Sequence, residues 1–125
     1  MVIRQALQFM VIGVLGLLCA CTMSHDFTPL LHTEPAAGAT LDRAPRILRL
    51  YYNALPDVSQ SSLRLVGPSG EHQLRGLHTM AADDLMIEIM DLLYNGDYTV
   101  EWVTMVGEDP NRYEGSFQFQ VAVPE

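Results

Sequence analysis

Hydrophobic and polar residues alternate along most of the chain after residue 28, with the period of two that β-strands require. The clearest run is 46–52, in which Leu48, Leu50 and Tyr52 share one face of a strand. Similar runs cover 28–33, 61–66, 71–77, 83–92, 96–106 and 115–123, and turn-forming residues separate them. Short strands with this spacing predict an all-β fold, an immunoglobulin-like Greek-key β-sandwich of about seven strands.

The alternation also predicts which side chains form the core. The expected inward residues are Leu85, Ile87, Ile89, Tyr98, Val100, Trp102, Thr104, Phe117, Phe119 and Val121. The segment 93–98, LYNGDY, is typical of a tyrosine corner, in which a Tyr hydroxyl bonds to backbone a few residues upstream. We therefore interpret Tyr98 and Trp102 as structural residues rather than ligands.

Residues 1–21 have a different pattern, an apolar stretch with Arg4 as its charge. The run from Ala6 to Leu18 is short and ends in small residues, which is the layout of a secretory signal peptide. We therefore expect an exported protein with a signal peptide at 1–20, a tether at 21–28 and one β-sandwich domain at 29–125.

Two processing sites are compatible with this signal. The segment 18–21, LCAC, resembles a lipobox, which predicts lipidation of Cys21 and, by resemblance to other lipoproteins, an outer-membrane anchor in the periplasm. Cleavage after Ser24 would instead release a soluble periplasmic chain that begins at His25. A free amino-terminal histidine offers an amine, a backbone nitrogen and an imidazole to Cu(II).

Composition excludes several function classes. The chain has 7 Lys+Arg and 15 Asp+Glu, a formal net charge of −8, and no lysine, so we expect no nucleic-acid partner and no basic lipid-binding patch. Both cysteines lie in the processing region, so no disulfide framework is expected. A nucleophile elbow and a phosphate-binding glycine loop are both missing from the sequence, so we do not expect an enzyme.

Two longer segments point to a family. The stretches 35–45, PAAGATLDRAP, and 95–102, NGDYTVEW, together with the aromatic strand at 115–121, resemble the CopC-like copper resistance family. The resemblance covers about residues 25–123. It implies a Greek-key β-sandwich that binds and carries copper in the periplasm, and so copper as the cofactor.

The resemblance also implies a Cu(II) site, and here the chain departs from the family pattern. Members use a histidine at the mature amino terminus, an acidic residue after the second strand and a histidine in a Ser-x-Asp-x-His segment. In this chain His25 lies about two residues early relative to Pro35, and the acidic position falls near Ala54, with Asp57 as the closest carboxylate. The third segment, 106–111, contains no histidine.

Other residues offer ligands for copper. Cu(I) prefers thioethers and imidazoles, and His72, His78 and Met80 lie where some family members carry a methionine-rich loop. Met86 and Met90 add two thioethers to a polar strand face, although methionine more often fills gaps. We therefore expect a copper carrier or buffer, binding Cu(I) through His78, Met80 and His72, or Cu(II) through a site that includes His25.

A second function from another class stays open. In this alternative, the chain is a CopC-like sandwich without a metal site. It serves as an interaction module that binds another envelope protein through its sheet edges or through the face that carries Met86 and Met90. Tight stoichiometric copper binding is expected of the first function and not of the second.

Overall fold

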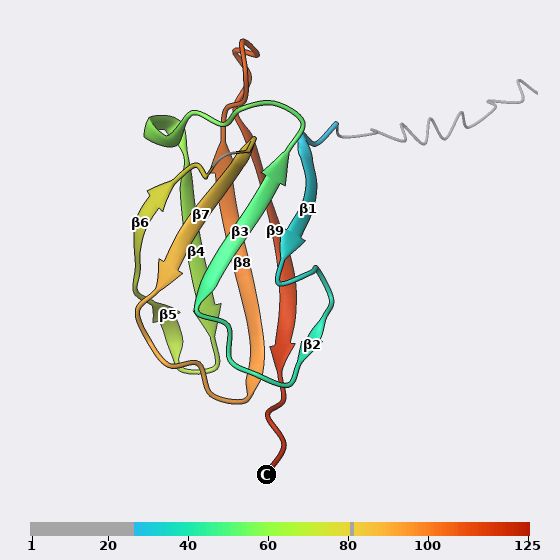
Figure 1. The fold of residues 1–125 in the computed structure, drawn as a ribbon, viewed down its shortest axis with the longest axis vertical. Coiled ribbons are helices and arrows are strands. Elements are labelled where there is room, and N and C mark those ends of the chain that lie inside the picture. The colour runs from blue at the N-terminus through green and yellow to red at the C-terminus, as the bar shows by residue number, and fades with distance from the viewer. Residues whose placement is uncertain (1–26, 81) are drawn as a thin grey trace, which may run out of the picture.

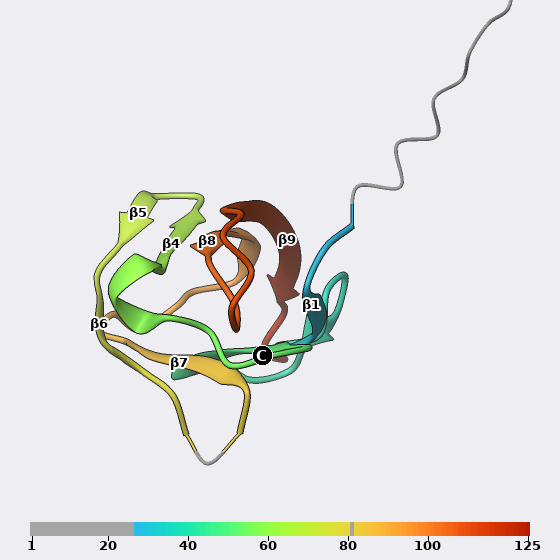
Figure 2. The ribbon, with the colours of Figure 1, turned by 90° about the horizontal axis from the view of Figure 1, so that it is seen from above.

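Two β-sheets pack face to face in the computed structural model, which describes residues 27–80 and 82–125 (Figure 1). Seen from above in Figure 2, they form two layers with the core between them. The four-stranded sheet has the order β1-β3-β7-β6 and the five-stranded sheet the order β2-β9-β8-β4-β5. The chain therefore passes repeatedly from one layer to the other, as in a Greek-key sandwich.

The strand bounds follow the predicted runs. The four-stranded sheet contains β1 (Leu30–Glu34), β3 (Ile47–Tyr52), β6 (Leu74–His78) and β7 (Asp84–Ile89). The five-stranded sheet contains β2 (Thr40–Leu41), β4 (Ser62–Gly67), β5 (Gly70–His72), β8 (Gly96–Thr104) and β9 (Tyr113–Val121). One 3-10 turn, η1 (Val58–Gln60), precedes β4. Among the described residues, no helix is long and apolar enough to cross a membrane.

Alternation along the strands produces the core. All of the inward residues predicted above are buried, together with Leu48, Leu50 and Tyr52 of β3. Tyr52 and Trp102 meet edge to face between the two sheets, with ring centroids 5.7 Å apart. Most of the polar residues that alternate with them face solvent, because adjacent strand side chains point to opposite sides of the sheet, whereas Thr33, Asp84 and Thr104 are buried.

The predicted tyrosine corner is confirmed. Tyr98 on β8 donates a hydrogen bond from its hydroxyl to the backbone oxygen of Tyr94, at 2.6 Å. Its ring stacks on that of Phe119, with centroids 5.4 Å apart. Tyr98 therefore anchors the connection between β7 and β8 and is a structural residue.

The expected single strand at 71–77 is wrong in one respect. The segment is divided into β5 and β6, which belong to different sheets. His72 pairs with Leu65 of β4, whereas Leu74 pairs with Ile89 of β7, so the chain changes sheets at Gln73. This division and the short β2 raise the strand number in the described residues above the seven expected, and β7 ends earlier than the predicted 83–92 run.

Candidate metal centre

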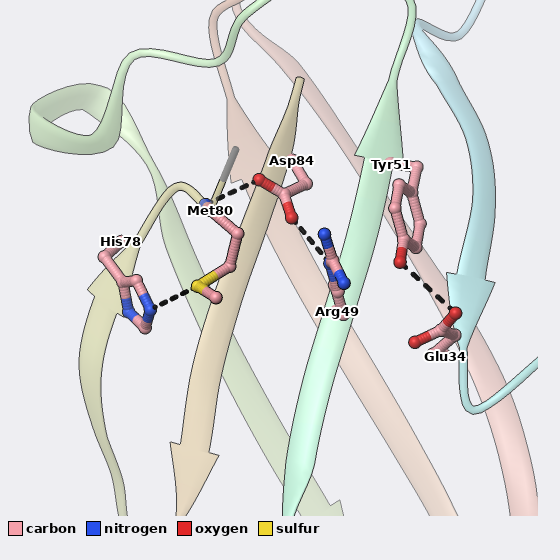
Figure 3. Close-up of polar contacts among 6 residues, drawn as sticks. All are labelled: Glu34, Arg49, Tyr51, His78, Met80 and Asp84. Atoms are coloured by element: carbon pink, nitrogen blue, oxygen red, sulfur yellow. Dashed lines mark hydrogen bonds and ion pairs between the residues drawn. The ribbon is translucent and has the colours of Figure 1, made fainter. Parts of the chain in front are cut away.

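His78 and Met80 lie at the end of β6 and in the segment that leads to β7. Nε2 of His78 lies 3.2 Å from Sδ of Met80 (Figure 3). The other ring nitrogen, Nδ1, contacts the backbone oxygen of Gly76, which has a φ of 75° and lies in β6 where the register with β7 shifts. A carbonyl oxygen only accepts hydrogen bonds, so in the neutral ring Nδ1 carries the proton and Nε2 carries a lone pair.

With the proton on Nδ1, Nε2 of the neutral His78 ring has no hydrogen atom to donate to Met80. A thioether sulfur is an acceptor, so in the neutral ring two lone pairs face each other. A shared cation would convert this unfavourable contact into a favourable one. Nitrogen and sulfur ligands at roughly 2.0 and 2.3 Å from one tetrahedral metal ion lie about 3.5 Å apart, close to the observed separation.

Asp84, the first residue of β7, holds Met80 in place. Its Oδ1 accepts a hydrogen bond from the backbone N–H of Met80 at 2.8 Å, and its Oδ2 accepts one from Nε of Arg49 at 2.6 Å (Figure 3). The Asp84 side chain is fully buried, whereas that of Arg49 is partly exposed. The hydrogen bond to Asp84 raises the pKa of Arg49 and keeps the guanidinium charged.

Strand pairing brings a second thioether close to His78. Met86 on β7 lies directly opposite His78 on β6. It alternates with the buried Leu85 and Ile87, so it lies on the outer face of the sheet. Directly opposed residues of antiparallel strands point to the same face, with Cβ atoms about 5 Å apart. The sequence identified this thioether, but only the register places it beside His78.

The same face carries an ordered polar array next to the candidate centre. The Arg49 guanidinium lies 4.6 Å from the ring centroid of Tyr51, and His32 stacks on that ring at 4.1 Å. The Tyr51 hydroxyl donates a hydrogen bond to Glu34 at 3.2 Å, as Figure 3 shows. Desolvation and the nearby Glu34 carboxylate raise the pKa of Tyr51.

His72 belongs to a different environment. It lies in β5 of the other sheet, and its Nδ1 lies 3.0 Å from Oδ2 of Asp91. Its imidazole is largely buried against Tyr98, and Nε2 is buried without a hydrogen-bond partner among the described residues. The bonds from His72 and from the backbone N–H of Gln73 lower the pKa of Asp91. The fold therefore brings together His78 and Met80 and leaves His72 apart from them.

Comparison with known proteins places the chain in a family. The profile of the CopC domain matches residues 30–122, about three quarters of the chain. The chain belongs to the CopC domain family. Protein YobA of Escherichia coli K12 is 28% identical over an alignment of 99 residues, and the match covers 74% of this chain and 76% of YobA.

Solved CopC-family structures share the fold. CopC from Methylosinus trichosporium OB3b superposes with a TM-score of 0.68 at 21% identity, covering 77% of this chain and 94% of that protein. PcoC, a copper resistance protein from Escherichia coli, gives a TM-score of 0.68 at 21% identity, covering 76% of this chain and 100% of PcoC. The predicted resemblance to this family and the predicted β-sandwich are both confirmed.

The two segments that the family resemblance relates to a Cu(II) site, near Ala54 and at 106–111, lie side by side in this chain. The backbone N–H of Gly107, in the β8–β9 loop, bonds to the oxygen of Leu55 at 2.8 Å. A Cβ atom on Gly107 would lie 3.2 Å from that of Ala54, so the expected acidic position faces the loop that lacks a histidine. The described residues contain no group of three His, Cys, Asp or Glu side chains arranged to hold a metal ion.

The nearby carboxylates have structural partners. Asp57 accepts a hydrogen bond from the backbone N–H of Ser59 at 3.0 Å and so caps η1. Asp109 accepts one from the Tyr113 hydroxyl at 2.6 Å, and this bond lowers the pKa of Asp109 and raises that of Tyr113. These contacts fit a local structural role for both carboxylates better than a metal site.

Two predicted residues at the amino terminus, His25 and Cys21, lie outside the described residues. The described chain begins at Phe27, whose ring meets that of Tyr113 edge to face at 5.8 Å. The described chain therefore begins beside Tyr113, the first residue of β9.

Proposed function

We propose that this protein is an exported copper-binding protein that carries or buffers copper in the cell envelope. Membership of the CopC family supports a copper-related function, and the structural relative PcoC is described as a copper resistance protein. The observation that supports the proposal most directly is the 3.2 Å contact between Nε2 of His78 and Sδ of Met80. Neither atom donates a proton to the other in the neutral ring, so the pair suits a shared cation.

The ligand chemistry favours Cu(I). Imidazole and thioether groups suit copper, and thioethers in particular select the soft Cu(I) ion. His78, Met80 and the cross-strand Met86 together form a set with one nitrogen and two sulfurs. The hydrogen bond that binds Nδ1 of His78 to Gly76 fixes the ring orientation, as backbone carbonyls do for many metal-binding histidines.

Export and anchoring complete the proposal. A signal peptide at 1–20 would direct the chain to the periplasm, and lipidation of Cys21 would anchor it to the outer membrane. Cleavage after Ser24 would give a soluble carrier whose free His25 amine and imidazole bind Cu(II). Intact mass of the mature protein distinguishes the two products, because only the first carries a diacylglyceryl group.

A competition titration tests the metal site. The mature chain from residue 21, with Cys21→Ser, is titrated against bicinchoninate for Cu(I) and separately against a Cu(II) chelator. We expect one equivalent of Cu(I) to be retained, and at least about a tenfold loss of affinity in the His78→Ala, Met80→Ala variant, since ligands act as a set. His32→Ala is the matched control, because this exposed histidine lies on the same sheet but outside the site.

Retention of Cu(I) by the double variant would contradict the assignment of His78 and Met80. Because His72 has its own partner, Asp91, His72→Ala should leave the Cu(I) affinity within about threefold. A large loss of Cu(I) affinity in that variant would indicate that His72 is a ligand after all.

A second candidate function is favoured by a separate surface. Leu92, Tyr94 and Val123 are exposed apolar residues that line one groove of about 770 Å³. Exposed apolar patches of this kind often mark protein interfaces. If the titration shows no retention of either copper ion, the interaction module becomes the better proposal, with this groove as its docking surface.

A further inference from the structure

The thioether of Met80 combines solvent access with a nitrogen lone pair as its neighbour. The residue is 47% exposed, and Nε2 of His78 lies 3.2 Å from its sulfur. Because the Gly76 carbonyl only accepts hydrogen bonds, the neutral ring carries its proton on Nδ1, and its Nε2 lone pair points at the sulfur. The second sulfur lone pair remains free for a reagent from solvent.

This arrangement favours oxidation. We propose that Met80 is a site of reversible oxidation by hydrogen peroxide, and that His78 accelerates the reaction. The sulfur lone pair attacks one peroxide oxygen, a sulfur–oxygen bond forms and the oxygen–oxygen bond breaks. Hydroxide leaves and takes up the proton from the transferred oxygen, so one thioether and one peroxide give one sulfoxide and one water. The sulfur is oxidised by two electrons and the peroxide is reduced by two.

His78 assists this step electrostatically. Repulsion between the two facing lone pairs raises the energy of the reduced thioether. As sulfur attacks peroxide it becomes positively charged, and the nearby Nε2 lone pair then stabilises it. Asp84 holds the backbone of Met80 through a 2.8 Å hydrogen bond, which restricts movement of the residue away from His78.

The consequence for metal binding rests on the function proposed above. A sulfoxide presents a hard oxygen and a sulfur without its former donor strength, so it is a poorer ligand for Cu(I) than a thioether. Oxidation of Met80 would therefore release Cu(I) from the site. Methionine sulfoxide reductases reverse the change, so the modification can act as a switch.

Met90 provides an internal reference. It is 39% exposed, similar to Met80, and it follows β7 at the opposite end of that strand from Asp84. Differences in the rate of oxidation between the two residues therefore report on their surroundings more than on solvent access.

The test is a time course of dilute hydrogen peroxide with the metal-free mature chain in the presence of a chelator, followed by peptide mass spectrometry. We expect Met80 sulfoxide to form at least about threefold faster than Met90 sulfoxide. In His78→Phe, which keeps a ring beside the sulfur but removes its lone pair, the ratio of the two rates should fall to about one. His32→Ala should leave the ratio unchanged.

Equal rates in the unmodified chain, or an unchanged ratio in His78→Phe, would overturn the proposal. The His78→Ala variant serves as a second test if the Phe variant does not fold. Because metal is absent throughout, this result is independent of whether the protein binds copper. Failure of the copper function appears separately, as no Cu(I) retention by the unoxidised chain in the chelator titration.

Discussion

Asp84 joins the candidate metal centre to the rest of its sheet. Its carboxylate accepts hydrogen bonds from Met80 and Arg49, and both partners are donors. A fully buried carboxylate is stable only when such partners compensate the loss of water. The position of Met80, and with it the spacing of the two candidate ligands, therefore depends on a residue whose hydrogen bonds go to Met80 and Arg49 rather than to His78.

Replacing Asp84 by asparagine tests this dependence. The amide of Asn has one acceptor and one donor group, so either Arg49 or Met80 would face a donor. We expect Asp84→Asn to lower the free energy of unfolding by about 2–4 kcal/mol in urea denaturation. Asp83→Asn is the matched control, since Asp83 is exposed, and should change it by less than about 0.5 kcal/mol. Equal effects in both variants would contradict the role of Asp84.

The tyrosine corner gives a second prediction for a single residue. Tyr98→Phe removes the hydroxyl that bonds to the backbone oxygen of Tyr94 at 2.6 Å and keeps the packed ring. We expect a loss of about 1–2 kcal/mol in the free energy of unfolding, because a partly buried carbonyl loses its partner. Tyr94→Phe keeps the backbone acceptor and alters only an exposed side chain, so chemical denaturation should show almost no change.

At the scale of elements, β8 and β9 form the longest ladder, and Gly115 is a point of close approach within it. Gly115 lies opposite Trp102 in the register of the two strands. A Cβ atom on Gly115 would lie 2.7 Å from the nearest carbon of the Trp102 indole, so the ring occupies the space that a side chain would need. The central tryptophan therefore packs directly against the backbone of β9.

The variant Gly115→Ala tests this packing. We expect a loss of about 1–3 kcal/mol, because the indole must shift in a well-packed core. The neighbouring exposed change Ser116→Ala should leave the midpoint of thermal unfolding almost unaltered. If Gly115→Ala is as stable as the unmodified chain, the Trp102 indole can shift at no cost, and the proposed tight packing against Gly115 is contradicted.

At the scale of the whole molecule, the two candidate surfaces lie at opposite ends. In Figure 1, β6 ends and β7 and β1 begin at the upper end, so the candidate metal centre and the amino-terminal end of the described chain share that end. The carboxyl terminus and the β7–β8 connection lie at the lower end, and the apolar groove includes residues from both. A tethered protein would therefore present this groove away from its attachment point.

Several carboxylates on different parts of the molecule are expected to make the folded protein less stable in acid. Hydrogen bonds from Arg64, His72 and Tyr113 lower the pKa values of Glu71, Asp91 and Asp109, respectively. A group with a lowered folded-state pKa stabilises the protein above its unfolded-state pKa, and this stabilisation disappears as pH falls through the folded-state pKa. We therefore expect urea midpoints to decrease below about pH 4.

The variant Asp91→Asn should make this decrease smaller, since it removes one of the contributing carboxylates. Glu114→Gln, at an exposed position of β9, is the control. The urea midpoint of this variant should depend on pH in the same way as that of the unmodified chain. An acid decrease that is the same in Asp91→Asn would show that the His72 to Asp91 pair does not contribute.

The sequence alone determined the sandwich class, the inward faces of the long strands and the tyrosine corner, and it predicted His78 and Met80 as candidate ligands. Each follows from local information: alternation with a period of two, turn residues and the two-residue spacing of a ligand pair. The tertiary structure decided that Met86 lies opposite His78, that Asp84 supports Met80 and that His72 belongs to another sheet. These contacts depend on strand register and on where the chain changes sheets, which arise from pairing between segments distant in the chain.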